Sequence, residues 1–220
     1  PMPEQISEFK DLKLPQSLND NIDRCGYQKL TIIQKNAIPI MNLRNNIMAS
    51  SQTGSGKTAS FLLPIIQNLL ESGPPKNDVS KEEFKKTRKC FPLAIVMAPT
   101  RELAIQIHEE ARKFCHLTGV LPKVIYGGKE AYNQQRYLSW DGCDILIATP
   151  GRLIDFMGRI VDFSFVRYIV LDEADRMLDM GFEPQIRNIM DECFAQTQGE
   201  NVQIAMFSAT FPKEVRNLAE

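Results

Sequence analysis

The chain of 220 residues is long enough for one sizeable domain or two small ones. A hydrophobic fraction of 43% and a charged fraction of 24% are typical of a soluble globular protein, and no apolar run approaches the roughly 20 residues that cross a bilayer. The formal net charge of −1 excludes a bulk basic field as the means of binding nucleic acid, so any such binding must rest on local geometry.

The five cysteines are scattered along the chain, and none is spaced C-x-x-C with another. This pattern argues against a disulfide framework and against a zinc site, and it is typical of reduced thiols in a cytosolic or nuclear protein. The polar N-terminal stretch does not resemble a signal peptide. We therefore expect no membrane contact, and nothing in the sequence requires a dimer, so a monomer is expected.

Short apolar runs alternate with helical patterns along the whole chain. Strands are predicted at 46–50, 93–99, 123–128, 144–150, 167–173 and 203–210, and helices at 57–71, 101–117, 131–139, 151–157, 184–195 and 212–219. This alternation predicts βαβ units, and the continuously apolar strands predict burial on both faces. The expected fold class is α/β, a doubly wound, mostly parallel β-sheet with helices on both faces.

Two details interrupt this regular pattern. Pro64 lies inside the first of these predicted helices, where it is expected to remove a backbone hydrogen bond and to kink the helix. The segment 71–90 contains Gly-Pro-Pro and many lysines, which favours a solvated loop over a functional basic patch. Neither detail indicates a domain boundary, because the alternation resumes at once.

The first predicted strand leads into SSQTGSGKT at residues 50–58, which matches the end of the phosphate-loop pattern G-x-x-x-x-G-K-[ST]. Ser51 stands where that pattern has its first glycine. Gly54 and Gly56 permit backbone angles and a close approach to phosphate that a Cβ would hinder. Lys57 is expected to neutralise the β- and γ-phosphates, and Thr58 to offer its hydroxyl to Mg²⁺.

The fifth predicted strand ends in Asp172 and Glu173, two adjacent carboxylates. Phosphoryl transfer to water needs one carboxylate near the metal and one that orients or deprotonates the water. Asp172 is assigned to Mg²⁺, partly through water, and Glu173 to the water nucleophile. A strand that ends in Asp-Glu is weak evidence alone, but it is strong when it is paired with a phosphate loop.

An unusual motif follows each of the six predicted strands. After the phosphate loop come PTREL, Gly127-Gly128, TPGR, DEAD and SAT, in this order. Because the carboxyl ends of parallel strands lie on the same edge of a sheet, the six motifs predict one continuous working surface.

These motifs and their order resemble those of the DEAD-box RNA helicases. The letters DEAD are residues 172–175, and PTRELA (99–104), TPGR (149–152) and SAT (208–210) stand at the expected places. The resemblance covers essentially the whole chain and is closest to the Vasa-like branch. It implies a RecA-like fold, ATP and Mg²⁺ as cofactors and RNA as a partner, and SQTGSGKT is a normal phosphate loop in that family.

The resemblance also implies two regions and a set of nucleotide contacts. Residues 1–34 would be the adenine-recognition segment, or Q motif, and residues 35–220 the RecA-like ATP-binding helicase domain. A glutamine amide donates and accepts together, so Gln34 could pair with one edge of adenine, and Phe9 could stack on the base. The implied nucleotide-binding residues are Phe9, Tyr27, Thr31, Gln34, Ser51, Gln52, Thr53, Gly54, Ser55, Gly56, Lys57 and Thr58. Gln34 and the lack of an N-K-x-D motif disfavour a signalling GTPase.

The remaining motifs resemble the family's RNA contacts, which read the sugar-phosphate path with little sequence specificity. The implied residues are Pro99, Thr100, Arg101, Gly127, Gly128, Thr149, Pro150, Gly151 and Arg152. Thr149 could cap a helix whose first residue is Pro150, which would place Arg152 near free N–H groups. The alternative is that Thr-Pro only starts a helix and that Arg152 is a surface salt-bridge partner.

Ser208 and Thr210 are added to Lys57, Asp172 and Glu173 as catalytic residues, because SAT couples hydrolysis to strand separation in the family. Their hydroxyls are expected to bond Asp175 or Glu173, from a strand beside the DEAD strand. The expected function is the N-terminal half of an ATP-dependent RNA helicase; an ATP-gated RNA clamp is the alternative. No H-R-x-G-R-x-x-R element is found, so the C-terminal RecA-like domain is expected to be missing and this part alone to be nearly inactive.

Overall fold

The computed structural model describes residues 3, 6–73, 86–199 and 201–218. Six strands form one sheet in the order β1-β6-β5-β2-β4-β3, and every neighbouring pair is parallel. The strands are β1 Ile47–Ser50, β2 Ala94–Met97, β3 Pro122–Ile125, β4 Ile145–Ala148, β5 Tyr168–Asp172 and β6 Gln203–Ser208. The predicted α/β fold with a doubly wound sheet is confirmed, and each strand lies inside its predicted range or within one residue of it.

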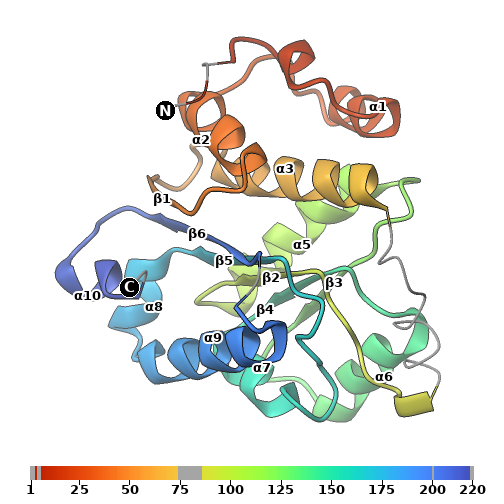
Figure 1. Cartoon of the computed structure of the whole chain (residues 1–220), viewed down its shortest axis with the longest axis vertical. Coiled ribbons are helices and arrows are strands. Elements are labelled where there is room, and N and C mark those ends of the chain that lie inside the picture. The colour runs from red at the N-terminus through yellow and green to blue at the C-terminus, as the bar shows by residue number, and fades with distance from the viewer. Residues whose placement is uncertain (1–2, 4–5, 74–85, 200, 219–220) are drawn as a thin grey trace.

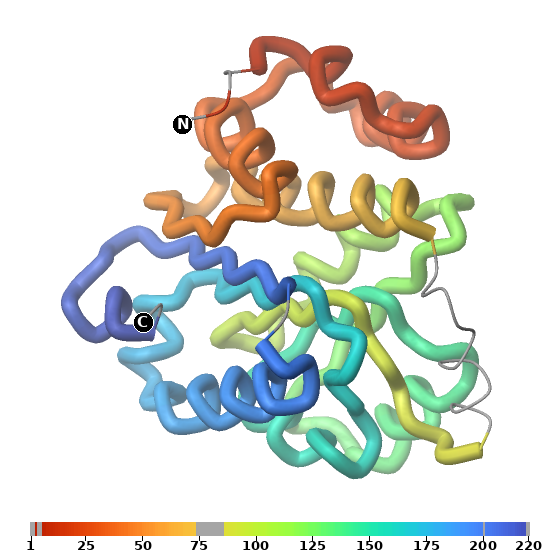
Figure 2. Tube along the Cα trace, viewed as in Figure 1, coloured from red at the N-terminus to blue at the C-terminus, as the bar shows by residue number. Residues whose placement is uncertain are grey.

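Helices cover both faces of the sheet (Figure 1). The described helices are η1 Phe9–Leu12, α1 Gln16–Arg24, α2 Ile32–Asn42, α3 Lys57–Ser72, α5 Arg101–Cys115, α6 Ala131–Asp141, α7 Pro150–Phe156, α8 Ala174–Asp179, α9 Glu183–Thr197 and α10 Lys213–Arg216. The sequence patterns did not predict α1, α2 or α8. In the Cα trace of Figure 2, α1 and α2 lie outside α3, on the side of the sheet opposite α7 and α9.

Each central strand contributes alternate side chains to two separate hydrophobic cores. In β2, Ala94 and Val96 join the core beneath α3 and α5, whereas Ile95 and Met97 join the core that contains residues of α7, α8 and α9. Burial on both faces explains why these strands are apolar throughout, as expected of a covered parallel sheet.

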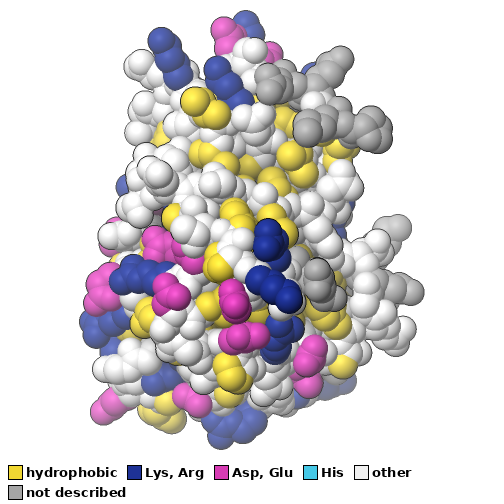
Figure 3. Space-filling view, turned by 90° about the vertical axis from the view of Figure 1, so that its left-hand side faces the viewer, with side chains coloured by type: hydrophobic (Ala, Val, Ile, Leu, Met, Phe, Trp, Pro, Cys, Tyr) yellow, Lys and Arg dark blue, Asp and Glu magenta, His cyan; other side chains and the backbone are white. Residues whose placement is uncertain are grey.

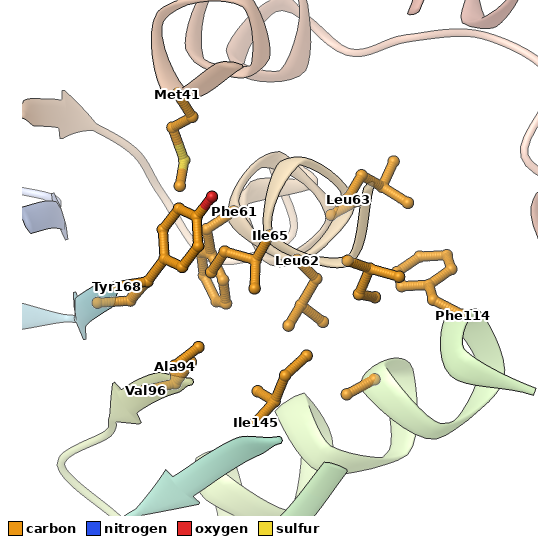
Figure 4. Close-up of a cluster of buried hydrophobic side chains, with 14 of the residues drawn as sticks. Met41, Phe61, Leu62, Leu63, Ile65, Ala94, Val96, Phe114, Ile145 and Tyr168 are labelled. Atoms are coloured by element: carbon orange, nitrogen blue, oxygen red, sulfur yellow. The ribbon is translucent and has the colours of Figure 1, made fainter. Parts of the chain in front are cut away.

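Helix α3 is buried on all sides, and it positions the phosphate loop that precedes it. Phe61, Leu62, Leu63 and Ile65 have at most 1% of their surface exposed, and Figure 4 shows this helix between Met41, Tyr168 and Phe114 and above the sheet. The helix runs through Pro64 without ending there. Because α2 packs against α3, the N-terminal residues form part of the same core.

Three further expectations from the sequence concern the lysine-rich segment, the cysteines and the crossing of a membrane. Residues 74–85 of the lysine-rich segment lie outside the described residues. All five cysteines are free thiols. Among the helices that the structure describes, none is both long and apolar enough to cross a membrane.

Truncation of the α3 core should be strongly destabilising. Leu62 is fully buried, so Leu62→Ala should lower the free energy of unfolding by about 2–5 kcal/mol, because it removes apolar contacts and leaves a cavity. Leu43 is 55% exposed, and Leu43→Ala, as the control, should change stability by no more than about 0.5 kcal/mol. Urea denaturation measures both, and equal effects would contradict the burial described here.

Candidate functional site: the carboxyl edge of the sheet

The loop at residues 51–56 joins β1 to the buried helix α3. Ser51 N donates to Ser208 O at 2.9 Å, which continues the β1–β6 ladder, and Ser55 N donates to Gln52 O at 3.2 Å, which closes a turn. Gly54 and Gly56 have φ of 79° and 82°, in the left-handed region that favours glycine. The first backbone N–H groups of α3 have no partner within the helix, and this compact loop leads directly into them. Such an arrangement is typical of an anion-binding site.

Gln34 holds this loop from the side of α2. Its Oε1 accepts from Thr31 N at 2.9 Å, and its Nε2 donates to Gly56 O at 3.1 Å. Thr31 caps α2 by accepting from Gln34 N. The Gln34 side chain is fully buried, so the structure places it against the phosphate loop, and its contact with adenine stays a prediction.

Gly56 is confined by both conformation and space. A Cβ built on Gly56 would lie 2.6 Å from Gln34 Nε2 and 2.9 Å from Thr31 Oγ1. Gly54 has a similar φ, but a Cβ there would meet nothing within 4 Å. Only Gly56 is therefore needed for the close approach of α2 to the loop.

Lys57 and the two strand-end carboxylates form the centre of the site. Lys57 Nζ lies 3.0 Å from Asp172 Oδ1 and 3.3 Å from Glu173 Oε1, although the three residues come from α3 and from the end of β5. Lys57 and Asp172 are both buried. Burial raises the pKa of Asp172 to about 6, although the Lys57 ammonium opposes this rise.

The Asp172 carboxylate has one oxygen without a hydrogen-bond partner. Asp172 Oδ1 accepts from Glu173 N at 3.0 Å and faces Lys57, whereas Oδ2 is buried and has no hydrogen-bond partner in the structure. One carboxylate oxygen, the Thr58 hydroxyl and phosphate oxygens are the hard ligands that Mg²⁺ prefers, so these residues fit the predicted metal.

Glu173 lies between two cations in an uncommon backbone conformation. It has φ of 51°, which is rare for a residue with a side chain, and it directly precedes α8. Its Oε2 lies 3.2 Å from Arg176 Nη1, on the other side from Lys57. The sequence motif did not indicate Arg176, although a cation three residues after a helix-preceding carboxylate is a readable signal.

Ser208, the last residue of β6, and Thr210 beyond it both bond Asp175, the second aspartate of the DEAD sequence. Thr210 donates to Asp175 Oδ2 from its backbone N at 3.1 Å and from its hydroxyl at 2.9 Å, and Ser208 Oγ accepts from Asp175 N at 3.1 Å. Burial raises the pKa of Asp175, but the contacts with the Thr210 and Ser208 hydroxyls outweigh this effect, so the pKa is lowered. Of the two residues considered for these hydroxyls, the structure selects Asp175, whose carboxylate accepts from Thr210 and whose backbone N–H donates to Ser208.

The two threonines that precede helices at this edge behave differently. Thr100 caps α5, because its hydroxyl accepts from Leu103 N at 3.2 Å. Thr149 precedes Pro150, the first residue of α7, but its hydroxyl accepts from Gly127 N at 3.3 Å and does not bond its own helix. The expectation that Thr149 caps α7 is therefore wrong, because β3 and β4 are neighbours and bring Gly127 within its reach.

Arg152 is a buried residue, and it also forms a salt bridge with the exposed Asp155, as the alternative interpretation expected. Its Nη2 donates to Lys129 O at 3.0 Å, its Nε lies 3.6 Å from Asp155, and its guanidinium carbon lies 5.6 Å from the centre of the Phe156 ring. Both Nε and Nη1 are buried and lack a hydrogen-bond partner in the structure. Because Nε faces Asp155, Nη1 is the donor of the guanidinium that stays open to an anion.

Lys129 is a further cation of this region, which the motifs did not indicate, and it lies beside Arg101 and Arg152. Arg101 and Lys129 both lie over the Tyr126 ring, with their charged groups 5.0 and 5.5 Å from its centre. Lys129 directly follows the Gly-Gly motif, which is the signal that could have revealed it. Figure 3 looks onto the side where β5 and β6 end, and basic and acidic side chains are interspersed over its lower half.

The two aromatic residues assigned to the nucleotide pack against each other and toward α5. The rings of Phe9 and Tyr27 lie 6.4 Å apart, edge to face, and Tyr27 also contacts Phe114. The Tyr27 hydroxyl donates to Glu110 Oε2 at 2.9 Å. These contacts give Tyr27 a place in the core around α5, and its role toward a nucleotide stays a prediction.

Comparison with known proteins identifies similar chains. The model of the DEAD/DEAH box helicase family matches residues 31–218. A DEAD box protein from the hyperthermophile Methanococcus jannaschii is 34% identical, with a TM-score of 0.81 over 98% of this chain and 53% of its own. The yeast DEAD-box splicing factor Prp28 is 30% identical, with a TM-score of 0.87 over 99% of this chain and 50% of its own. The present chain thus spans about half the length of each.

The close approach at Gly56 predicts a difference between two glycine substitutions. Gly54→Ala and Gly56→Ala share the cost of a left-handed residue, roughly 1–2 kcal/mol. Only Gly56→Ala also forces a Cβ against Gln34 and Thr31, which should lower the free energy of unfolding by about 1–3 kcal/mol more. Thermal or urea unfolding measures both, and equal losses would show that the gap at Gly56 is not confined.

The raised pKa of Asp172 predicts a pH dependence in metal-free protein. Because the folded-state pKa of about 6 exceeds the unfolded-state value, the contribution of this carboxyl to stability is full at low pH and is lost as the pH rises through 6. In Asp172→Asn this part of the pH dependence should disappear, on the order of 2–3 kcal/mol between pH 4 and 6.5. Denaturation in EDTA at several pH values measures it, with the exposed Asp179→Asn as control. A variant profile parallel to the parent profile would contradict this assignment.

Proposed function

Because the chain belongs to the DEAD/DEAH box helicase family, we propose that it is the nucleotide-binding, N-terminal part of an ATP-dependent RNA helicase. The observation that carries the proposal is the contact of Lys57 Nζ with both Asp172 and Glu173 at the end of β5. The predicted resemblance to the family and the RecA-like fold are confirmed, and the Vasa-like branch stays a prediction.

The phosphates of ATP would replace the carboxylates as the partners of Lys57. Its ammonium already lies at the start of α3, beside the free N–H groups of the loop, so a short movement suffices for the exchange. Thr58 and Asp172 would hold Mg²⁺, which neutralises phosphate charge when it is bound. Gln34 would then read adenine, and Phe9 would stack on it.

Glu173 would orient the attacking water and accept its proton. Once Lys57 has turned to the phosphates, Arg176 remains beside Glu173 Oε2 at 3.2 Å and keeps the carboxylate in place. Asp172 next to it is fully buried, whereas the Glu173 side chain keeps 17% of its surface exposed. This difference in exposure supports the assignment of Asp172 to the metal and of Glu173 to the attacking water.

RNA would lie along the same edge and be held by its sugar-phosphate backbone. Arg101 and Lys129 lie over Tyr126, and Arg152 bonds Lys129 O while its Nη1 stays unpaired. These cations would supply local positive charge despite the net charge of −1. The remaining contacts would come from residues 99–100, 127–128 and 149–151. Because these groups meet backbone and not base edges, we expect little sequence specificity.

Ser208, Thr210 and Asp175 would couple the two ligands. Asp175 lies two residues after Glu173, and its carboxylate is bonded to Thr210 beyond β6. A movement of Glu173 on hydrolysis would therefore be passed to the loop after β6 through α8.

In the whole protein, a second RecA-like domain would close over ATP and RNA. Residues 1–34 would act as the adenine-recognition segment and residues 35–220 as the first helicase domain. Arginines from the second domain would stabilise the transferring phosphoryl group, an effect worth about 10³–10⁵ in rate in related enzymes. This chain alone should therefore turn over ATP very slowly, and unwinding by the whole protein distinguishes a helicase from an ATP-gated RNA clamp.

Nucleotide binding by this chain tests the proposal directly. ADP with Mg²⁺ should raise the melting temperature because it binds only the folded state, and GDP should raise it much less. Lys57→Ala should lose the shift caused by ADP, whereas Lys113→Ala, which removes an exposed lysine on α5, should keep it. Each variant is compared with its own ligand-free melting temperature, so a loss of stability does not confuse the result. Equal shifts by ADP and GDP, or a full shift in Lys57→Ala, would refute the assignment.

A further inference from the structure

The exposed face of α6 carries an aromatic and basic stripe that the proposed site does not use. Tyr132, Arg136 and Trp140 lie four residues apart on this helix, so they share one face over about 12 Å. Tyr132 is 65% exposed and Trp140 is 83% exposed, an unusual exposure for such large aromatic rings. We call these three residues the α6 stripe.

The α6 stripe begins where the carboxyl-edge surface ends. Helix α6 follows β3, the outermost strand of the sheet, and starts directly after Gly127, Gly128, Lys129 and Glu130. Lys129 lies over the Tyr126 ring together with Arg101, and Tyr132 is three residues further on. An alternation of cations and aromatic rings therefore continues from the sheet edge onto the helix.

The charge of the α6 stripe is available to an anionic partner. The Arg136 guanidinium lies 6.0 Å from the centre of the Tyr132 ring and is exposed. Of the carboxylates near the two ends of the helix, Asp141 pairs with Lys123, whereas Glu130 accepts from the neutral Asn133 and has Lys129 as its sequence neighbour. The exposed cation of the stripe thus lies between two exposed rings.

We propose that the α6 stripe extends the RNA path beyond the carboxyl edge, with bases stacked on Tyr132 and Trp140 and a phosphate paired with Arg136. This rests on the proposed function, RNA binding along that edge. Exposed aromatic rings alternating with cations are the means by which proteins hold single strands without reading sequence. A 12 Å stripe matches roughly three to four stacked nucleotides at 3.4 Å each. RNA is favoured over a protein partner because the stripe continues the edge and its free charge is positive.

The chain offers a direct reporter, because Trp140 is its single tryptophan. Single-stranded oligouridylates of 6 and 12 nucleotides, the longer one in excess of what the edge can hold, are titrated at low salt with Mg²⁺-ADP. Anisotropy of fluorescein-labelled RNA reports all binding, and intrinsic fluorescence reports stacking on Trp140 alone. The 12-mer should quench Trp140, and the 6-mer, held at the edge, should quench it much less.

Variants of the α6 stripe complete the test. Tyr132→Ala and Trp140→Ala should each weaken 12-mer binding roughly 5- to 150-fold, the effect of losing one stacked base. Arg136→Gln should lower the salt slope of 12-mer binding by about 0.7. Leu117→Ala, which truncates an exposed side chain after α5, should change neither quantity.

The outcomes separate the inference from the function on which it rests. If anisotropy shows no RNA binding by the parent chain, RNA binding along the edge fails and the inference fails with it. If RNA binds and Arg101→Gln weakens it, but Trp140 fluorescence and the affinities of the stripe variants are unchanged, only the inference is overturned. That second result would place the α6 stripe outside the RNA path.

Discussion

The buried ion pair between Lys57 and Asp172 is the constraint on which the site depends. A buried Asp172 carboxylate left alone would cost several kcal/mol, and without a ligand Lys57 is held by this carboxylate and by Glu173. The pair joins the first residue of α3 to the last residue of β5, although β6 lies between β1 and β5 in the sheet. The three segments after these strands are therefore held within one small volume.

The strand order explains the division of the edge into two regions. The phosphate loop, the DEAD sequence and the SAT sequence follow β1, β5 and β6, which are neighbours at one side of the sheet. The motifs that follow β2, β4 and β3 occupy the other side, where Arg101 and Lys129 lie over Tyr126 and Arg152 bonds Lys129 O. The proposed nucleotide and RNA regions would thus lie side by side, with Asp175 and Thr210 on the nucleotide side of their border.

Much of this arrangement could be predicted from the sequence, because covered parallel strands are apolar throughout and the chain turns at their carboxyl ends. The predicted strand 167–173 is observed as β5 Tyr168–Asp172, and Lys57 meets Asp172 as the motifs indicate. Helix α1 gave little signal, because Leu18 and Ile22 are its only apolar residues. The contact of Thr149 with Gly127 could not be predicted, because it depends on which strands are neighbours and not on local sequence.

The two hydrogen bonds of Gln34 have a consequence for selectivity. Its amide is fully buried and uses one acceptor site toward Thr31 N and one donor toward Gly56 O, so one lone pair and one N–H stay unused. Under the proposed function, a matching base would pair with this remaining donor and acceptor for a modest net gain, whereas a mismatched base would leave a buried group unpaired, at about 1–3 kcal/mol. Gln34 would then contribute more to the rejection of wrong bases than to the affinity for the right one.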